Sequence, residues 1–371
     1  MQSIITSESN FVQLDDWIKQ NSIQKLMLVC DSSLKFLTAI NDKLSCLDTQ
    51  IIRFDDFQPN PLYESVVKGV ELFRNEKCDA IMAIGGGSAI DVAKCIKLYS
   101  NMQGRGENGG FLKQPIVANT IPFLAMPTTA GTGSEATRFA VIYYDDKKQS
   151  VADNSCIPTT VLFDPSVLKT LPIYQKKATM MDAFCHAIES FWSVNSNEES
   201  KKYSADAIKL ILESMNGYLE NDDKANAEML KAANLAGKAI NITQTTAGHA
   251  MCYKLTSLYG IAHGHAAALC VKTLFPYMID NTDKCIDQRG EEFLCRTFDE
   301  IANAMGCMTA QSAADRFADI VNSLDFKPLK PNGESDIDIL KSSVNPDRLK
   351  NNPVILSAST IMQLYVELLR Q

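Results

Sequence analysis

The sequence predicts an α/β fold in its first half and an all-helical fold in its second half. Up to about residue 172, short apolar segments alternate with segments whose apolar residues recur at helical spacing. Beyond residue 176 only the helical spacing continues, and no convincing strand follows. Since 371 residues exceed what one ordinary core accommodates, we expect two domains, at residues 1–172 and 173–371.

Apolar runs of strand length recur through the first half. They are KLMLVCD (25–31), QIIRFDDF (50–57), AIMAIGGGS (80–88) and PFLAMPTT (122–129). Segments 61–79 and 89–100 have helical patterns and separate the last three of these runs. Strands joined by helical crossovers form a mostly parallel sheet with both faces covered.

Two further strand-like features lie at the end of this half. RFAVIYYDD and QSVADN flank Lys147 and Lys148, which predicts an antiparallel hairpin, and TTVLFDP (159–165) is the last strand-like run. In the second half the helical pattern is clearest in three segments. They are KATMMDAFCHAIESFW (177–192), SKKYSADAIKLILESM (200–215) and ANAEMLKAANLAGKAINITQ (225–244).

Composition limits the classes of partner and compartment. The net charge of -8 and the lack of a basic run argue against binding to nucleic acid. Eleven cysteines without a C-x-x-C spacing favour free thiols in a reducing compartment. No apolar run is long enough to span a bilayer, and the N-terminus does not resemble a signal peptide. We therefore expect a cytoplasmic protein with no membrane partner.

Of three glycine-rich segments, the first two differ in the secondary structure predicted before and after them. Gly85, Gly86, Gly87 and Ser88 leave a strand and enter a helix, where free backbone N–H groups and the helix dipole suit a pyrophosphate. A tight turn with Ser88 as helix cap is the alternative. Gly104, Gly106 and Gly109 match G-x-G-x-x-G but follow a helix, so we interpret them as a flexible loop.

The segment PTTAGTGSEATR (127–138) also follows a strand. It is either a second cofactor-binding loop or an ordinary hairpin loop. Asp31 ends the first predicted strand, where its carboxylate could accept hydrogen bonds from a ribose or cap the next helix.

The histidines are concentrated in one part of the chain. Three of the four lie between residues 249 and 265, and His186 follows Asp182 by one helical turn. His249 and His263 would be about 21 Å apart on one straight helix, but Gly260 is a plausible helix stop that turns the chain back. A site of one carboxylate and three imidazoles would suit iron(II) or zinc rather than magnesium or calcium. With so few histidines, chance clustering is the alternative.

Five motifs occur in a fixed order along nearly the whole chain: GGGSAIDVAK, PTTAGTGSEAT, FDP, MDAFCHAIES and AHGHA. In this set and order the sequence resembles the iron-containing (group III) alcohol dehydrogenase family. The resemblance implies a dehydroquinate-synthase-like fold, with an N-terminal dinucleotide-binding domain and an all-α C-terminal domain. It also implies an NAD(H)-dependent, metal-dependent enzyme that interconverts a small aldehyde and its primary alcohol, with iron(II) or alternatively zinc, and a homodimer.

The resemblance also assigns roles to residues of this chain. The metal ligands implied are Asp182, His186, His249 and His263. The pyrophosphate residues implied are Gly85, Gly86, Gly87 and Ser88, with Asp91 in the following helix. The nicotinamide and ribose side corresponds to Thr128, Thr129 and Thr132. Asp31 matches the acid that favours NAD over NADP, and Lys148 loosely matches a lysine that reaches the cofactor from the hairpin.

One position departs from the family pattern. Many members have a further histidine four residues after the third ligand, and here that residue is Tyr253. Tyr253 is therefore a candidate proton donor, or a residue that only lines the pocket. His265 is the other candidate, with a purely structural position as its alternative.

Within the family, HAMCYKLTSLYGIAHGHA and SSVNPDRLKNNPV most resemble phosphonoacetaldehyde reductases, which form 2-hydroxyethylphosphonate. Lys254 and Arg138 are candidate cations for a phosphonate, or ordinary surface residues. The alternatives are a general short-chain alcohol, diol or lactaldehyde dehydrogenase and, more remotely, a non-enzymatic NAD- or metal-binding protein.

Overall fold

The computed structural model describes residues 2–333, 335–344 and 346–370. The chain divides into two compact units. One comprises Met1–Thr129 and Gly133–Leu171, and the other comprises Ala130–Thr132 and Pro172–Gln371. The first unit is built around a parallel sheet and the second is helical, so the predicted fold class is confirmed.

The first unit has a six-stranded sheet in the order β1-β8-β5-β4-β2-β3, with every neighbouring pair parallel. The strands are β1 (Ser3–Thr6), β2 (Lys25–Cys30), β3 (Gln50–Phe54), β4 (Ala80–Gly85), β5 (Phe123–Pro127) and β8 (Thr160–Phe163). The central strands β4 and β5 are buried throughout, as expected for strands covered on both faces. The short edge strand β1 is largely exposed and was not indicated by the sequence pattern.

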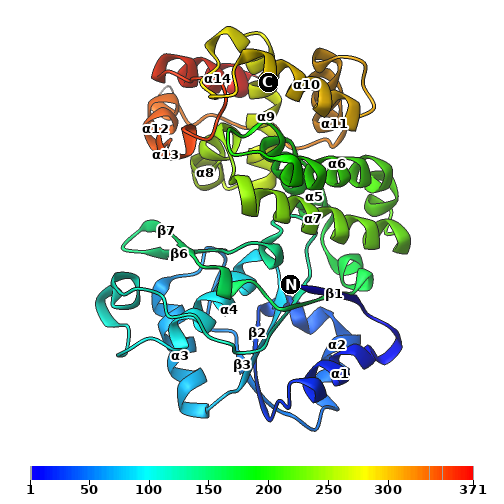
Figure 1. Ribbon diagram of the computed structural model, residues 1–371, viewed down its shortest axis with the longest axis vertical. Helices are drawn as coiled ribbons and strands as arrows, with labels where there is room; N and C mark the ends of the chain where they lie inside the picture. The colour runs from blue at the N-terminus through cyan, green and yellow to red at the C-terminus, as the bar shows by residue number, and fades with distance from the viewer. Residues whose placement is uncertain (1, 334, 345, 371) are drawn as a thin grey trace. The chain divides into compact units, whose positions relative to one another are not determined.

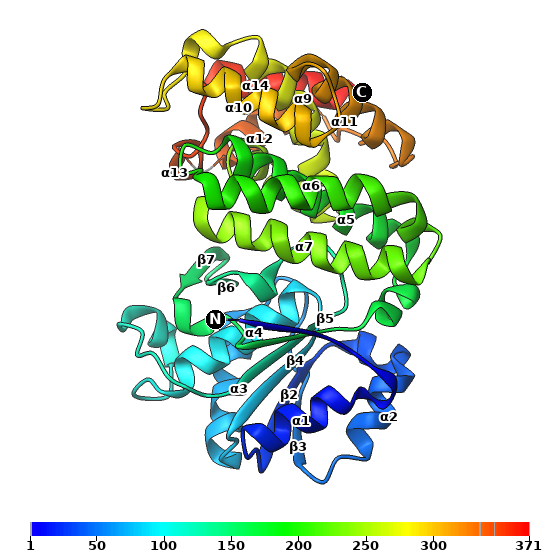
Figure 2. The same ribbon diagram turned by 45° about the vertical axis from the view of Figure 1, so that its right-hand side comes forward.

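Helices cover both faces of this sheet, as Figure 2 shows. Helices α3 (Tyr63–Glu76) and α4 (Gly87–Ser100) lie on one face, and α1 (Val12–Gln20) and α2 (Thr38–Ser45) lie on the other. The core beneath α3 and α4 includes Val66 and Ile90 with alternate residues of β4 such as Ile81. This core holds the first turn of α4 against the carboxyl end of β4.

The predicted hairpin is confirmed. Strands β6 (Phe139–Tyr144) and β7 (Lys147–Ala152) pair antiparallel, and Tyr143 lies opposite Lys148. Asp145 and Asp146 form the turn with positive φ angles of 51° and 56°, the conformation that a two-residue hairpin turn requires.

The second unit contains only helices among the described residues, apart from an isolated bridge between Cys285 and Val354. They are α5 (Ile173–Trp192), α6 (Glu198–Leu219), α7 (Asp223–Thr243), α8 (Ala247–Tyr259), α9 (His263–Ile279), α10 (Glu291–Ala304), α11 (Ala310–Ser323), α12 (Ser335–Ser343), α13 (Pro346–Leu349) and α14 (Ala358–Arg370). Helix α5 packs against α6, α7 and α9 (Figure 1). Its second half is therefore buried on every side.

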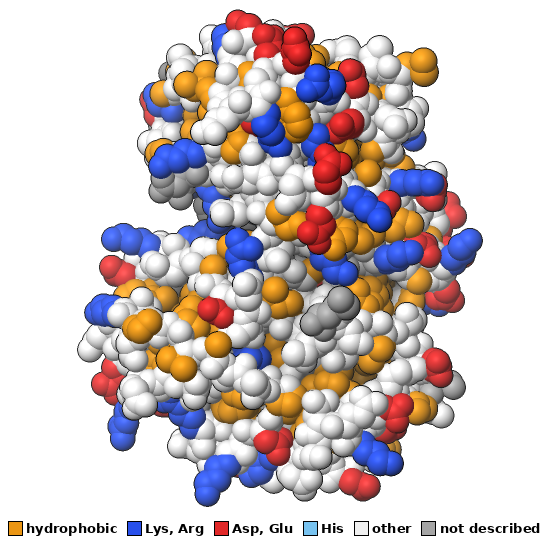
Figure 3. Space-filling view, in the orientation of Figure 1, with side chains coloured by type: hydrophobic (Ala, Val, Ile, Leu, Met, Phe, Trp, Pro, Cys, Tyr) orange, Lys and Arg blue, Asp and Glu red, His pale blue; other side chains and the backbone are white. Residues whose placement is uncertain are grey.

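Short 3-10 helices complete the chain. They are η1 (Ser9–Phe11), η2 (Ser32–Phe36), η3 (Glu107–Gly109), η4 (Phe111–Lys113), η5 (Ser134–Ala136), η6 (Asn154–Cys156), η7 (Pro165–Thr170) and η8 (Thr282–Lys284). None of the described helices has the length and apolar content needed to cross a bilayer. On the face drawn in Figure 3, basic and acidic side chains are interspersed.

Candidate functional site

Asp182 and His186 lie one turn apart on the buried second half of α5. Because α5 is enclosed by other helices, both side chains are almost completely shielded from solvent. A buried charged group without a partner destabilises the folded state. The charge states of Asp182 and His186 therefore depend on the side chains next to them.

The turn after α8 brings two more histidines to this point. As the sequence predicted, helix α8 ends at Gly260, whose φ of 65° is left-handed. The next helix, α9, begins at His263. Gly264 lets the start of α9 approach α5 closely, since a Cβ there would overlap the Ala178 carbonyl oxygen. The two histidines therefore sit on the first turns of two different helices, next to α5.

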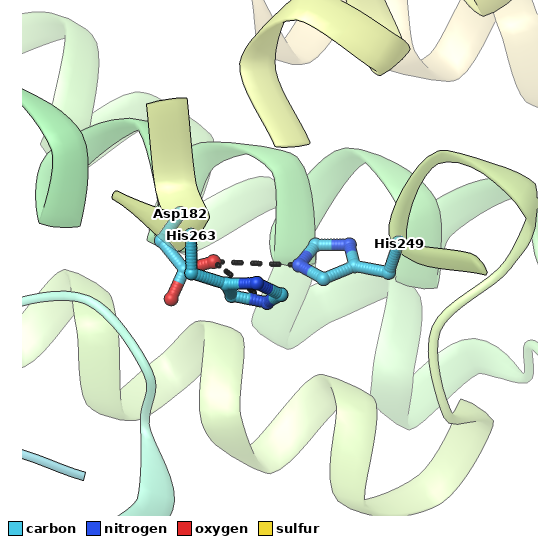
Figure 4. A group of neighbouring side chains, drawn as sticks. All are labelled: Asp182, His249 and His263. Atoms are coloured by element: carbon cyan, nitrogen blue, oxygen red, sulfur yellow. Dashed lines mark hydrogen bonds and ion pairs between the residues drawn. The ribbon is translucent and has the colours of Figure 1, made fainter. Parts of the chain in front are cut away.

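The side chains converge on one oxygen of Asp182. Oδ1 lies 3.3 Å from Nε2 of His249 and 3.9 Å from Nε2 of both His186 and His263. One ligand atom each from Asp182, His249 and His263 lies within 4.8 Å of the others (Figure 4). These donors suit a divalent iron or zinc ion, and the chemistry of the donor set therefore fits the predicted metal.

The charge states in this cluster follow from burial and from each other. Burial would raise the pKa of Asp182, but His186, His249 and His263 hold it well below its usual range. Burial lowers the pKa of His186 to about 4, although Asp182 opposes this, and a neutral imidazole is the form that binds a metal. The rings of His186 and His249 stack with centroids 4.4 Å apart.

The first glycine turn has the geometry of an anion site. Gly85 has a φ of 157°, and a Cβ there would lie 2.6 Å from that of Ala89. Gly86 is the N-cap of α4 and no side chain caps that helix, which leaves its first N–H groups available to an anion. The helix begins at Gly87, so the alternative with Ser88 as cap is wrong.

Asp31 lies beside this turn. Its Oδ1 accepts a hydrogen bond of 2.8 Å from the Ser33 backbone N–H and caps η2, which was one of the two alternatives. Its Oδ2 would be 3.1 Å from a Cβ on Gly85. The capping carboxylate therefore also lies next to the proposed pyrophosphate turn.

Asp91 and Lys94 hold the second glycine loop, residues 127–138, against α4. Asp91 accepts hydrogen bonds from Ser134 Oγ at 2.6 Å and from the Val141 N–H at 3.0 Å. The buried ammonium of Lys94 donates to Ser134 Oγ and to the carbonyls of Thr137 and Phe139. Burial raises the pKa of Asp91, and Lys94 opposes the rise. Both carboxylate oxygens of Asp91 therefore already have protein donors.

The threonines predicted for the cofactor are divided between the two units. The Thr128 N–H donates to the Gly85 carbonyl at 3.0 Å, and the Thr129 side chain lies 3.4 Å from a Cβ built on Gly86. Thr132 belongs to the helical unit. Lys148, on β7, is close enough to Asp91 to lower its pKa. Gly104, Gly106 and Gly109 lie in an irregular loop with η3, as predicted.

Comparison with known proteins identifies the family. The model of the iron-containing alcohol dehydrogenase family matches residues 2–165, and that of the Fe-containing alcohol dehydrogenase family, C-terminal, matches residues 176–369. Alcohol dehydrogenase 4 of Schizosaccharomyces pombe is 31% identical over 351 residues, covering 91% of this chain and 80% of that protein. The chain belongs to the iron-containing alcohol dehydrogenase family. Members of this family bind NAD and a metal.

Two further relatives act on aldehydes that carry an acid group. Phosphonoacetaldehyde reductase of Streptomyces viridochromogenes is 29% identical over 344 residues, covering 88% of this chain and 85% of that protein. The crystal structure of sulfoacetaldehyde reductase from Bifidobacterium kashiwanohense in complex with NAD+ has a TM-score of 0.88 and 25% identity, covering 99% of this chain and 97% of that one.

Tyr253 occupies the position where many members of this iron-containing alcohol dehydrogenase family have a histidine. It lies one turn after His249, and its ring stacks on that of His263 with centroids 5.4 Å apart. Burial raises the pKa of Tyr253, while Arg348 lowers it. The phenol therefore stays protonated beside a metal ligand at neutral pH.

Arg348 is a neighbour of this site that the sequence interpretation missed. It lies on α13, which packs against α8, and its charge acts on the Tyr253 hydroxyl. The following loop is held in place because Asn351 donates to the Thr245 carbonyl at 3.1 Å. Arg348 is half-buried, and no described acidic side chain forms an ion pair with it.

The other predicted catalytic and substrate residues occupy different surroundings. His265 is buried, bonded through Nδ1 to the Tyr174 hydroxyl at 3.1 Å and stacked on Phe326, and burial lowers its pKa to about 4. Lys254 is half-buried on α8, next to Tyr253. Arg138 lies in the α/β unit over the ring of Phe139. The structure does not bring His265 into the group formed by Asp182, His186, His249 and His263, here called the Asp182 cluster.

Proposed function

We propose that the protein is a metal-dependent NADH oxidoreductase that reduces phosphonoacetaldehyde to 2-hydroxyethylphosphonate. The observation that carries the substrate assignment is Arg348, a half-buried cation on α13 whose charge acts on Tyr253 and which forms an ion pair with no described acidic side chain. A guanidinium suits a phosphonate because its planar N–H groups match two oxygens at once. Lys254 follows Tyr253 on α8 and is the second candidate cation for the same group.

Two relatives support an acid-bearing substrate. Phosphonoacetaldehyde and sulfoacetaldehyde, which appear in the names of two similar proteins, are both two-carbon aldehydes with a tetrahedral anionic group. A site that holds such a group at one end fixes the carbonyl at the other end, which lowers the entropic cost of reaching the reactive geometry.

Different residues of this chain would hold the metal and the NADH. Asp182, His186, His249 and His263 would hold the metal, iron(II) or alternatively zinc, which supplies Lewis-acid polarisation of a carbonyl when bound. Gly85, Gly86 and Gly87 would hold the pyrophosphate of NADH at the start of α4, with Ser88 and Asp91 in its first turns and Thr128, Thr129, Thr132 and Lys148 toward the nicotinamide and ribose.

A proton must reach the substrate oxygen as the hydride arrives at the carbon. Tyr253 is a candidate because its hydroxyl is protonated at neutral pH and lies next to His263. Solvent is the other source. His265 is less suitable, because its Nδ1 is bonded to Tyr174 and its ring is covered by Phe326.

The second candidate function is a general short-chain alcohol, diol or lactaldehyde dehydrogenase. The identity to Alcohol dehydrogenase 4, slightly above that to the phosphonoacetaldehyde reductase, favours it. This function would use the same metal and NADH residues and would not need Arg348.

The test is the loss of NADH absorbance with iron-loaded protein and phosphonoacetaldehyde, sulfoacetaldehyde, propanal or lactaldehyde. We expect Arg348→Met to lower kcat/KM for the phosphonate roughly 30-fold or more, as for removal of one partner of a buried charge pair. The rate with propanal should change little. Arg296→Met, on the exposed surface of α10, is the matched control. Equal rates for all four aldehydes in the wild type would favour the general dehydrogenase.

We also propose a homodimer in the cytoplasm. The support for a reducing compartment is that all eleven cysteines are free thiols, seven of them buried. Analytical ultracentrifugation of the purified protein tests the dimer, and a monomer at micromolar concentration contradicts it.

A further inference from the structure

The buried carboxylate of Glu189 lies between the start of α8 and the ring of His249. Glu189 is on α5, one turn after His186, and its side chain is fully buried. Its Oε1 accepts hydrogen bonds from the Thr246 N–H at 3.2 Å, the Thr246 hydroxyl at 2.6 Å and the His249 N–H at 3.2 Å. Its Oε2 is bonded to Nδ1 of His249.

The contacts of Glu189 Oε1 cap helix α8. Thr246 is the N-cap residue of α8, but its own side chain makes no capping bond. Glu189 takes over this role from another helix, where a negative charge also complements the helix dipole. Gly248 leaves the necessary room, since a Cβ there would lie 3.0 Å from Oε1. The Thr246 hydroxyl in turn accepts from Trp192 Nε1 at 2.9 Å.

The contact with Nδ1 determines which ring nitrogen of His249 can bind a metal. A carboxylate can only accept, so Glu189 keeps a proton on Nδ1. The other nitrogen, Nε2, is the atom that lies 3.3 Å from Asp182 Oδ1. A metal bound there needs the lone pair of Nε2, which is available when the proton is on Nδ1.

We propose that Glu189 is the positioning residue of the metal centre, because one carboxylate both caps α8 and orients the ring and tautomer of the ligand on the first turn of α8. The start of α8 and the direction of Nε2 are then set by the same group. This inference rests on the metal site of the proposed function and adds a residue that does not touch the metal.

Glu189→Gln separates the two roles. The amide oxygen of glutamine can still accept from the Thr246 and His249 N–H groups, so the cap is preserved. Its NH2 group would face Nδ1 of His249, which favours the tautomer with the proton on Nε2. Thr246→Val removes the hydroxyl contacts with Glu189 and Trp192. It leaves both the backbone N–H bonds of the cap and the contact between Glu189 and His249.

The experiment measures zinc affinity of metal-free protein by competition with a chromophoric chelator, together with the melting temperature without metal. We expect Glu189→Gln to weaken zinc binding about 10- to 100-fold, as for other outer-shell partners of metal-bound histidines, with little change in melting temperature. Thr246→Val should lower the melting temperature and keep the zinc affinity. Glu199→Gln, at an exposed contact with Tyr203, should change neither. Unaltered zinc affinity in Glu189→Gln overturns the proposal.

A second measurement uses the unmodified protein, so it does not depend on how the variants fold. The chain has four histidines, which makes the NMR spectrum of 15N-histidine-labelled, zinc-loaded protein simple. His249 should show a proton on Nδ1 and zinc on Nε2, and the opposite assignment overturns the proposal. A wild-type protein that binds no zinc or iron contradicts the proposed function itself.

Discussion

Asp91 is a half-buried carboxylate on a helix of the first unit and Asp182 a buried one on a helix of the second, and their surroundings give them different capacities. Both oxygens of Asp91 accept short hydrogen bonds from Ser134 and Val141, with Lys94 close by. Asp182 instead has imidazole nitrogens at 3.3 to 3.9 Å around Oδ1. Because protein donors occupy both oxygens of Asp91, this carboxylate holds the second glycine loop in place. The longer distances from Asp182 Oδ1 to the imidazole nitrogens instead match a site for an ion.

The largest expected effect comes from replacing the carboxylate of the metal cluster. Asp182→Asn should lower kcat/KM for any aldehyde substrate by about three orders of magnitude, or about 4 kcal/mol of transition-state stabilisation, because a ligand charge is lost. Elemental analysis should show little bound metal. A variant that keeps full metal content and activity contradicts the assignment of Asp182 as a ligand.

Removal of the metal from the wild type should have an effect of comparable size. A chelator should abolish activity and lower the melting temperature, since an ion that binds only the folded state at 1,000 times its Kd contributes about 4 kcal/mol. Iron(II) or zinc added back should restore both. If melting is the same with and without metal, the Asp182 cluster does not bind an ion with useful affinity.

Asp91→Asn should act on stability rather than on the metal. An asparagine cannot accept from both Ser134 and Val141, and an unsatisfied polar group of this kind costs about 1 to 3 kcal/mol. Calorimetry should show a lower melting temperature with unchanged metal content. A changed KM for NADH with unchanged melting would instead support the cofactor role that the family resemblance implies.

The smallest effect is expected at His265. This buried histidine has a phenol and an aromatic ring beside it, in place of the carboxylates around His249. His265→Phe keeps the stacking on Phe326 and loses one hydrogen bond, worth about 1 kcal/mol. Metal content should be unchanged and kcat should stay within about threefold, roughly 0.7 kcal/mol. A loss of kcat with an intact metal site would restore His265 as a proton-relay candidate.

Much of the fold could be predicted from the sequence because the relevant signals are local. Apolar periodicity indicated β2, β4 and α5, the strand-like segments on either side of Lys147 and Lys148 indicated the β6-β7 hairpin, and Gly260 indicated the end of α8. The candidate ligands followed from rare residues, since four histidines leave few combinations. The strand β1 was missed because it is short and mostly exposed, so it lacks a strong apolar pattern.

Glu189 and Arg348 were missed for a different reason. Glu189 is one of 44 acidic residues, and its role appears only when the start of α8 meets α5. One signal was available, because Glu189 follows His186 by three residues within an otherwise apolar stretch and so shares its buried helix face. Arg348 is far from His249 in sequence, and only the packing of α13 on α8 brings it near Tyr253.

The tripeptide Ala130–Thr132 has a consequence for attempts to recombine this protein. It lies within the second glycine loop but belongs to the helical unit, so the chain passes between the units three times. Gly131 rests on Thr179 of α5, where a Cβ would come within 2.7 Å of the Thr179 Cβ and carbonyl oxygen. A chimaera that exchanges the helical half of two family members at Pro172 would leave this contact mismatched. The tripeptide and the second half would have to be inherited together.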